Sequence, residues 1–321
     1  MPWRDRPDPY GIWVSEVMLQ QTQVSTVVPY YIAWMERFPT IEALARSTEQ
    51  DALAMWQGLG HYKRCRQLRQ GAISVAQSGM PSSAEMWRKV PGVGEYTAAA
   101  ISSIAFSEPV PVVDGNVRRV YSRYSGDRSC GTRLHRAALA WAADELRSTG
   151  PGEWNQALME LGATVCKPVA PDCAACPLGS TCEARLRGIQ GELPTPAAPA
   201  KPLRLAHSAW VLLAGDRLGV RRIPPGRWWE GMWELPRAEK GRECEPAALA
   251  DLLRSLPVER LGVVRHSVTN HRIELTAYAA HIPDSSPELR WGMPGEISAL
   301  PMPSPQRKVL QLALLHFGLA E

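Results

Sequence analysis

Four cysteines near the middle of the sequence have the spacing of a metal or cluster site. They are Cys166, Cys173, Cys176 and Cys182, arranged as C-x6-C-x2-C-x5-C. Disulfides are rare in a reducing cytosol, and structural zinc sites commonly use two close cysteine pairs, whereas this motif has one pair between two single cysteines. Four thiolates on a compact loop suit a [4Fe–4S] cluster. The motif therefore favours an iron–sulfur cluster and leaves zinc open as the alternative.

Two acidic residues lie in contrasting environments. Glu16 stands in IWVSEVMLQQTQ, among tryptophan and aliphatic side chains at helical spacing. Such surroundings raise a carboxyl pKa, so Glu16 is predicted to hold a proton near neutral pH. Asp114 precedes the helical segment NVRRVY and is predicted to be its N-cap, where the helix dipole stabilises an anion. A pair of carboxyl groups, one protonated and one ionised, suits cleavage of a glycosidic bond. An exposed helix glutamate and a purely structural cap are the alternatives.

A glycine turn, PGVG, precedes the small-residue helix EYTAAAISSIAF. Gly92 and Gly94 fit neither a Walker A loop nor a dinucleotide-binding fingerprint, because the flanking residues of both motifs are absent. Free N–H groups at a helix start bind phosphate. Between two helices, this turn is typical of a helix–hairpin–helix that holds a DNA backbone phosphate without sequence preference.

These residues need a helical scaffold, and the sequence from Tyr10 to about Leu161 predicts one helix after another. The predicted helical segments are 11–24, 29–38, 41–56, 62–77, 95–106, 116–124, 133–147 and 153–166. Glycine and proline punctuate them. Ser47 and Asp114 are predicted N-caps.

The pattern changes after the cysteine motif. Residues 191–204 are rich in proline and alanine and predict a stiff, extended linker. Beyond the linker we expect a hairpin of 208–215 and 217–223 around Asp216, a helix over 245–256, strands over 261–267 and 272–282, and a closing helix over 304–317. The sequence therefore predicts an all-α domain over 1–190 and a small α+β domain over 205–321.

Charge and composition are compatible with a nucleic-acid partner. The chain has 321 residues and a formal net charge of +4. Arginine and lysine concentrate in 61–69 and 116–136, which is typical of a phosphate-binding face, although a solvated helix surface gives the same pattern. No apolar run reaches the roughly 18 residues that a membrane helix needs. The first residues carry no apolar signal region, so we expect a cytosolic protein without a membrane partner.

Several motifs together resemble one family. WVSEVMLQQTQV, GLGHYKRCRQL, VPGVGEYTAAAI, VVDGNVRRV, NQALMELGATVC and the four-cysteine loop follow one another as in the adenine DNA glycosylase (MutY) family. The resemblance covers nearly the whole chain. It implies a helix–hairpin–helix DNA glycosylase fold with one [4Fe–4S] cluster on the cysteine loop, and a Nudix-like domain that recognises 8-oxoguanine. The implied partner is duplex DNA with adenine opposite 8-oxoguanine or guanine, and the expected state is a monomer.

The resemblance also assigns roles by position. Glu16 is expected to protonate the flipped adenine and Asp114 to stabilise the sugar cation, with Tyr96 and Asn116 beside them. The residues expected to contact adenine or the surrounding DNA are Trp3, Gln20, Gln21, Thr22, His61, Tyr62, Gly92, Gly94 and Glu160. The related endonuclease III family has a lysine at the position of Tyr96, and a phenol cannot form its Schiff base. We therefore predict a glycosylase without efficient lyase activity.

The chain departs from the family pattern at two lesion-reading positions. His61 stands where members usually have tyrosine, and the stretch that is Phe-Ser-His in the family is Val268-Thr269-Asn270 here. Thr269 and Asn270 are the expected lesion contacts. The Nudix hydrolase box is missing, so no catalytic metal ion is expected and the domain is interpreted as a recognition module. A relative acting on thymine or uracil opposite guanine, or a catalytically silent lesion-binding protein, is the alternative.

Overall fold

The computed structural model describes residues 1–5, 8–146, 150–196, 201–239, 251, 253–268, 270–282 and 286–319. Contacts divide the chain into two compact units. The first comprises residues 1–47 and 67–199, and the second comprises 48–66 and 200–321. Among the described helices, none has the length and hydropathy needed to cross a membrane.

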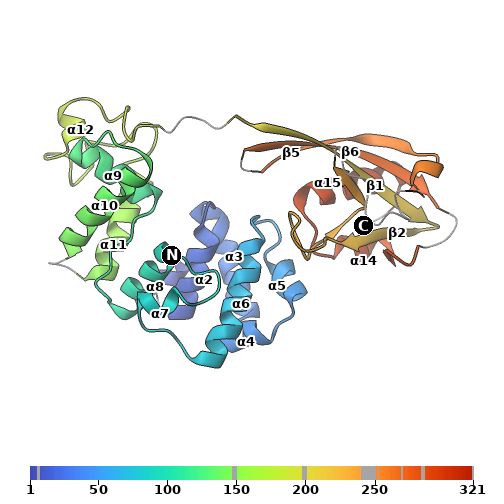
Figure 1. The fold of residues 1–321 in the computed structure, drawn as a ribbon, viewed down its shortest axis with the longest axis horizontal. Helices are drawn as coiled ribbons and strands as arrows, with labels where there is room; N and C mark the ends of the chain where they lie inside the picture. Colours follow the sequence, from blue (N-terminus) through green and yellow to red (C-terminus); the bar gives the residue numbers. More distant parts are fainter. Residues whose placement is uncertain are drawn as a thin grey trace. The chain divides into compact units, whose positions relative to one another are not determined.

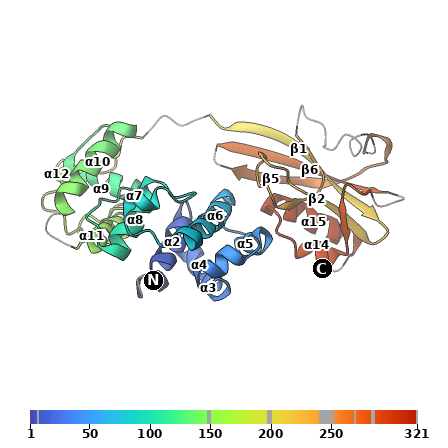
Figure 2. The same ribbon diagram turned by 60° about the horizontal axis from the view of Figure 1, so that its bottom comes forward.

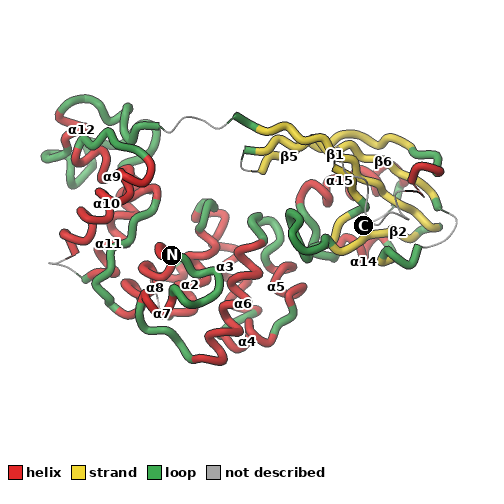
Figure 3. Tube along the Cα trace, in the orientation of Figure 1, coloured by secondary structure: helices red, strands yellow, loops and turns green. Residues whose placement is uncertain are grey.

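The first unit is helical (Figures 1 and 3). Its helices are α1 (Pro2–Asp5), α2 (Pro9–Leu19), α3 (Val24–Arg37), α4 (Ile41–Arg46), α6 (Lys63–Ser78, from Gln67 on), α7 (Ala84–Trp87), α8 (Glu95–Phe106), α9 (Gly115–Ser125), α10 (Gly131–Glu145), α11 (Pro151–Glu160), the π-helix η2 (Leu161–Val165) and α12 (Glu183–Leu186). The predicted all-α class is confirmed.

Helix α2 is the central element of this unit. It is buried on all sides, packs against α3 and α8, and α8 in turn packs against α11, as Figure 2 shows. The indole of Trp13 makes an edge contact with Trp87 at 5.1 Å between ring centroids. A helix buried all round has apolar residues on every face. The few polar side chains on α2 therefore face partners inside the unit.

Two helix ends differ from the prediction. The helix predicted over 11–24 ends at Leu19, because Gln20 leaves the helical conformation and Gln21 adopts a φ of 56°. The helix predicted over 41–56 is split, because Ser47 and Thr48 are both extended. The Ser47 cap prediction is wrong, since Ser47 ends α4 while Thr48 caps α5 (Glu49–Met55). The apolar period continues across both breaks, which is why periodicity alone misses them.

The second unit contains a twisted sheet together with helices. Its elements after α5 are β1 (Leu203–Ala214), β2 (Arg217–Arg222), β3 (Trp233–Glu234), β4 (Arg237–Glu239), β5 (Glu259–Val268), β6 (His271–His281), β7 (Arg290–Gly292), α14 (Pro294–Ser298) and α15 (Ser304–Phe317). The strand order is β3-β2-β1-β6-β5, with β4 paired to β1 and β7 to β2. Strands β1 and β6 are parallel and the other pairs are antiparallel.

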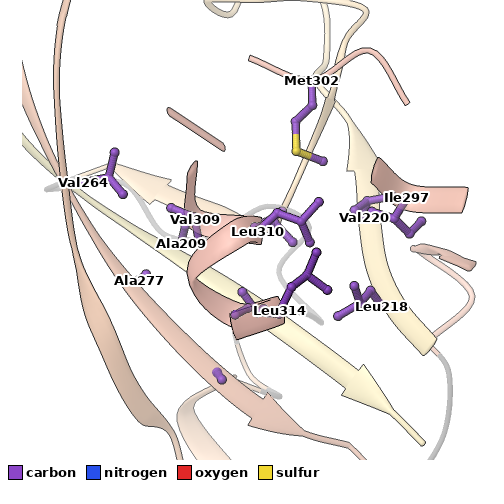
Figure 4. Close-up of a cluster of buried hydrophobic side chains, with 14 of the residues drawn as sticks. Ala209, Leu218, Val220, Val264, Ala277, Ile297, Met302, Val309, Leu310 and Leu314 are labelled. Atoms are coloured by element: carbon purple, nitrogen blue, oxygen red, sulfur yellow. The ribbon is translucent and has the colours of Figure 1, made fainter. Parts of the chain in front are cut away.

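The core of this unit lies between the sheet and α15. Figure 4 shows Val309, Leu310 and Leu314 of α15 among Leu218 and Val220 and other buried side chains of the sheet. The predicted hairpin around Asp216 is confirmed by the β1–β2 pairing. The two later strands and the closing helix are also present. The predicted helix over 245–256 lies mostly outside the described residues.

Candidate active site

A cavity of about 860 Å³ opens in the first unit, between α2, α8, α9 and α11. This volume is typical of sites for small organic groups. Nine of the predicted site residues line the cavity: Trp3, Glu16, Gln20, Gln21, Thr22, Tyr96, Asp114, Asn116 and Glu160. The fold thus brings together residues from five separate segments of the sequence.

Glu16 is the buried acid of this cavity. Its side chain projects from α2, and the residue is 7% exposed. Its pKa is raised from the ordinary 4.5 to about 7, chiefly by burial and also by the negative charge of Asp114. A hydrogen bond from Tyr96 and the charge of Arg4 oppose this shift. Glu16 therefore holds its proton in an appreciable fraction of molecules at neutral pH.

Asp114 is the N-cap of α9, as predicted. Its Oδ1 accepts a hydrogen bond from the backbone N–H of Val117 at 2.7 Å, and its Oδ2 accepts one from the side-chain amide of Asn116 at 2.8 Å. An N-cap aspartate faces the positive end of the helix dipole. The local fold therefore fixes this carboxylate in the cavity wall.

A chain of hydrogen bonds fixes Asn116 in turn. The guanidinium of Arg119 donates to Asn116 Oδ1 at 2.8 Å, to the carbonyl of Gly162 at 2.7 Å and to the carbonyl of Cys166 at 2.8 Å. A Cβ on Gly162 would lie 2.6 Å from the Cβ of Asn116, so the π-helix approaches α9 only through a glycine. The cysteine loop is thus connected to the Asp114 carboxylate through Arg119 and Asn116.

Tyr96 lies on α8 and contacts the acid directly. Its hydroxyl hydrogen-bonds Glu16 and also donates to the sulfur of Met159 at 3.3 Å. Burial strongly raises the pKa of this phenol, and the charge of Glu16 adds to the shift. Tyr96 is therefore a neutral phenol at neutral pH.

Trp3, Arg4 and Glu160 line a further part of the cavity. Arg4 forms an ion pair with Glu160, and the indole of Trp3 makes an edge contact with Tyr31 at 5.2 Å. The planar and charged groups here can contact the faces and edges of a heteroaromatic ring.

The QQT stretch forms the turn after α2. Gln20 donates from its side-chain amide to Thr97 Oγ1 at 3.3 Å, which ties the turn to α8. Gln21 and Thr22 also line the cavity. The early end of α2 is what releases these three residues from the helix and turns them toward the cavity.

The glycine turn lies at the start of α8 and is not part of the cavity lining. Gly92 has a φ of 80°, which only glycine adopts without strain, and Gly94 is the N-cap with no side-chain hydrogen bond. Because Gly94 has no side chain, it cannot cap the backbone N–H groups at the start of α8. The phosphate role of the turn stays a prediction.

The remaining predicted contacts lie in the second unit. His61 is exposed with a φ of 47°, and burial of part of its ring and the charge of Arg64 lower its pKa. Tyr62 is 4% exposed and its hydroxyl accepts a hydrogen bond from the Gly58 N–H at 3.3 Å, so Tyr62 stabilises the turn between Gly58 and Tyr62 from inside.

Asn270 is exposed beside the β5–β6 turn. Thr269 lies outside the described residues.

The four cysteines line one small cavity of their own. Burial raises the pKa of the Cys176 thiol, and the negative charges of Cys166, Cys182 and Cys173 raise it further, so the four sulfurs lie near one another. Arg123 donates to the Cys166 sulfur at 3.4 Å. Within the described ranges, no three His, Cys, Asp or Glu side chains are placed to hold a single metal ion.

Comparison with known proteins agrees with this geometry. A model described as HhH-GPD superfamily base excision DNA repair protein matches residues 14–142, and a NUDIX domain model matches 208–312. Adenine DNA glycosylase from Rattus norvegicus is 44% identical, and the match covers 89% of this chain and 68% of the rat protein. The chain belongs to the adenine DNA glycosylase family. The human family member is also 44% identical, over 60% of this chain.

The chain spans about 38% of that human relative's length and about 46% of the length of its Arabidopsis thaliana counterpart. Among solved structures, a thermostable thymine-DNA glycosylase superposes with a TM-score of 0.54 and 27% identity, covering 58% of this chain and 88% of that protein. The glycosylase fold of the first unit is therefore shared beyond the adenine DNA glycosylase family.

Sequence reasoning missed several residues of this adenine DNA glycosylase family site. Arg4 and Met159 each contact a predicted residue that lies far away in the chain, whereas Arg119 contacts Asn116 three residues earlier, within the motif VVDGNVRRV. Arg4 follows Trp3 directly, which was a usable signal. The cavity wall also includes Arg118, His135 and Gln156. Arg118 and Gln156 lie within the motifs VVDGNVRRV and NQALMELGATVC, and His135 lies in the arginine-rich segment 116–136, yet none of the three was predicted to line the site.

Proposed function

We propose that this protein excises adenine from duplex DNA in which adenine is opposite 8-oxoguanine or guanine. The observation that supports this is the meeting of Glu16 and Asp114 in one cavity, the first with a pKa of about 7 and the second held as a helix N-cap. Adenine enters the cavity only after it is flipped out of the duplex, because its glycosidic bond is inaccessible while the base is stacked.

In the proposed reaction, Glu16 donates its proton to the adenine ring and the N-glycosidic bond breaks. Adenine leaves with the bonding electron pair, and the sugar becomes an oxocarbenium-like cation. The negative charge of Asp114 stabilises this cation. Water then adds to the sugar carbon and its proton passes to the Glu16 carboxylate, which restores the acid and yields an abasic site.

Tyr96 supports a glycosylase without efficient lyase activity. A lyase needs an amine that forms a Schiff base with the sugar. Tyr96 offers a neutral phenol to Glu16 at the position where the endonuclease III family carries lysine. Borohydride treatment during turnover should therefore trap little protein on DNA, and efficient trapping of the native chain contradicts this part of the proposal.

The cysteine loop fits one [4Fe–4S] cluster. Four half-buried thiols line a small cavity, and Arg123 donates a hydrogen bond to one of them. Such a cluster, when bound, cross-links the loop through four thiolates. Gly179 allows the loop to close, because a Cβ there would lie 3.0 Å from the carbonyl oxygens of Cys173 and Cys176. Iron analysis and visible absorbance of the purified protein test this assignment against zinc.

The decisive experiment measures abasic-site formation in a single turnover, with alkaline cleavage as the readout. The duplexes carry adenine opposite 8-oxoguanine, guanine or cytosine, and a fourth carries thymine opposite guanine. We expect excision from the first two. Glu16→Gln should bind the 8-oxoguanine duplex and leave adenine attached, whereas the exposed control Glu95→Gln on α8 should excise normally. Excision by Glu16→Gln at the native rate contradicts the mechanism.

A further inference from the structure

The segment 107–113 brings Asp114 to the catalytic cavity without the support of a helix or a strand. It connects the end of α8 to the start of α9 and has no regular secondary structure. Pro109 and Pro111 have no backbone N–H and restrict φ, which disfavours a helix here. Val112 is 1% exposed, so the backbone at this point is buried and each of its polar groups needs a partner.

Asn155 of α11 supplies these partners. Its side-chain amide donates to the carbonyl of Val110 at 2.9 Å, and its side-chain oxygen accepts from the N–H of Val112 at 3.1 Å. An amide side chain offers a donor and an acceptor side by side, so Asn155 pairs with the segment as a neighbouring strand would. Asn155 is 0% exposed and does not line the catalytic cavity. Its connection to the site runs through the segment that ends at Asp114.

The face of α11 that carries Asn155 contacts both parts of the site. Met159 lies four residues later on the same face of the helix, and its sulfur accepts the hydrogen bond from Tyr96. Tyr96 in turn hydrogen-bonds Glu16. One face of α11 is therefore connected to Asp114 through the segment before it and to Glu16 through Tyr96.

Gly152 determines how closely this face approaches α8. It lies three residues before Asn155, and a Cβ there would lie 2.6 Å from the carbonyl oxygen of Ser103 and 2.8 Å from the Cα of Ile104. The two helices can approach this closely only through a glycine, and α11 also packs against α9. A side chain that positions another group must itself be held in place, and here close backbone packing holds the helix that carries it.

We propose that Asn155 is a positioning residue that fixes the Asp114 carboxylate in the wall of the catalytic cavity. The N-cap hydrogen bonds of Asp114 orient its oxygens within the first turn of α9. The pairing of Asn155 with Val110 and Val112 fixes where that turn stands relative to Glu16. The inference rests on the proposed function, in which the charge of Asp114 stabilises the sugar cation. Displacement of a reacting group by about 1 Å costs about 100-fold in rate.

The test compares the full native chain with the full chain carrying Asn155→Leu. Leucine is close to asparagine in shape, so this variant removes both hydrogen bonds and still keeps water out of the space. Binding is measured to two duplexes with 8-oxoguanine opposite an altered nucleotide. The first duplex has a neutral tetrahydrofuran ring in place of the sugar and base, and the second has a protonated pyrrolidine ring, which imitates the sugar cation.

Asn155→Leu should bind the neutral duplex with the native Kd and bind the cationic duplex about tenfold or more weakly than the native chain does. Its single-turnover excision of adenine should be about 100-fold slower. If Asn155→Leu does not fold, Asn155→Ser is used, because its hydroxyl can still pair with one of the two backbone groups. It should show a smaller loss of the same kind, confined to the cationic duplex.

Leu44→Ala is the control for a general loss of stability, because Leu44 is 0% exposed on α4 and its truncation leaves a cavity in the first unit. It should lower the melting temperature and change neither the ratio of the two Kd values nor the excision rate. A native ratio of the two Kd values in the Asn155 variant overturns the inference, as does an equal loss of affinity for both duplexes.

Excision by the native chain separates the two proposals. If the native chain excises adenine and Asn155→Leu keeps the native ratio of Kd values, only the positioning role is wrong. If Asn155→Leu loses affinity for the cationic duplex alone but the native chain excises no adenine, only the proposed function is wrong.

Discussion

Replacing Glu16 by glutamine should make the protein more stable above neutral pH. In the unfolded chain this carboxyl releases its proton near the ordinary pKa of 4.5, whereas in the folded chain burial holds the proton until about pH 7. Between these values the folded state binds more protons, so the free energy of unfolding falls as pH rises through this window. The shift corresponds to about 3 kcal/mol at about 1.4 kcal/mol per pKa unit. Glutamine does not ionise, so the variant does not lose this free energy of unfolding as the pH rises.

The assay is urea unfolding of the native chain and Glu16→Gln at about pH 5 and about pH 8, followed by far-ultraviolet circular dichroism. The difference in free energy of unfolding between the variant and the native chain should grow by about 2.5 kcal/mol from the lower to the higher pH, because the unfolded carboxyl is already partly ionised at pH 5. Glu95→Gln, at an exposed position in the first turn of α8, is the control and should show no such growth. A Glu16→Gln difference that is the same at both pH values refutes the reasoning, because the buried carboxyl would then ionise as it does in the unfolded chain.

Three further outcomes follow from individual contacts. Gly162→Ala should slow single-turnover excision by more than about tenfold, because the new methyl group displaces Asn116, which it would meet at 2.6 Å. Tyr96→Phe should move the alkaline limb of the excision rate to higher pH, because loss of its hydrogen bond removes an effect that lowers the pKa of Glu16. Gly179→Ala should reduce the iron content of the purified protein, since the added Cβ crowds two carbonyl oxygens of the cysteine loop at 3.0 Å.

One control serves both glycine variants. Gly191 has no atom within 4 Å of the place where a Cβ would lie, so Gly191→Ala should change neither excision nor iron content. Native excision by Gly162→Ala would show that the π-helix does not position Asn116. A full iron content in Gly179→Ala would show that the loop tolerates the crowding. An unchanged or acid-shifted limb in Tyr96→Phe would show that the phenol does not lower the pKa of Glu16.

Local signals in the sequence were sufficient for part of the site. Asp114 is followed by a helical segment that needs a cap, and the structure places it as that cap. The raised pKa of Glu16 was predictable from the apolar neighbours on its own helix. By contrast, Arg4 meets Glu160 across 156 positions of sequence, and no periodicity connects them. The end of α2 at Leu19 is equally invisible, because the turn after it is set by Gln21 in a left-handed conformation and not by glycine or proline.

Tyr96 shows how the choice of one side chain constrains the chemistry of another. Its hydroxyl contacts Glu16 inside the first unit, where the acid must keep a proton at neutral pH. A lysine at this position would place an ammonium beside the carboxyl, and an opposite charge within about 4–6 Å favours the ionised form and lowers the carboxyl pKa. Glu16 would then lose its proton below neutrality and could no longer act as the acid of the proposed mechanism. In that mechanism, a neutral donor both withholds the amine that a lyase needs and keeps Glu16 protonated.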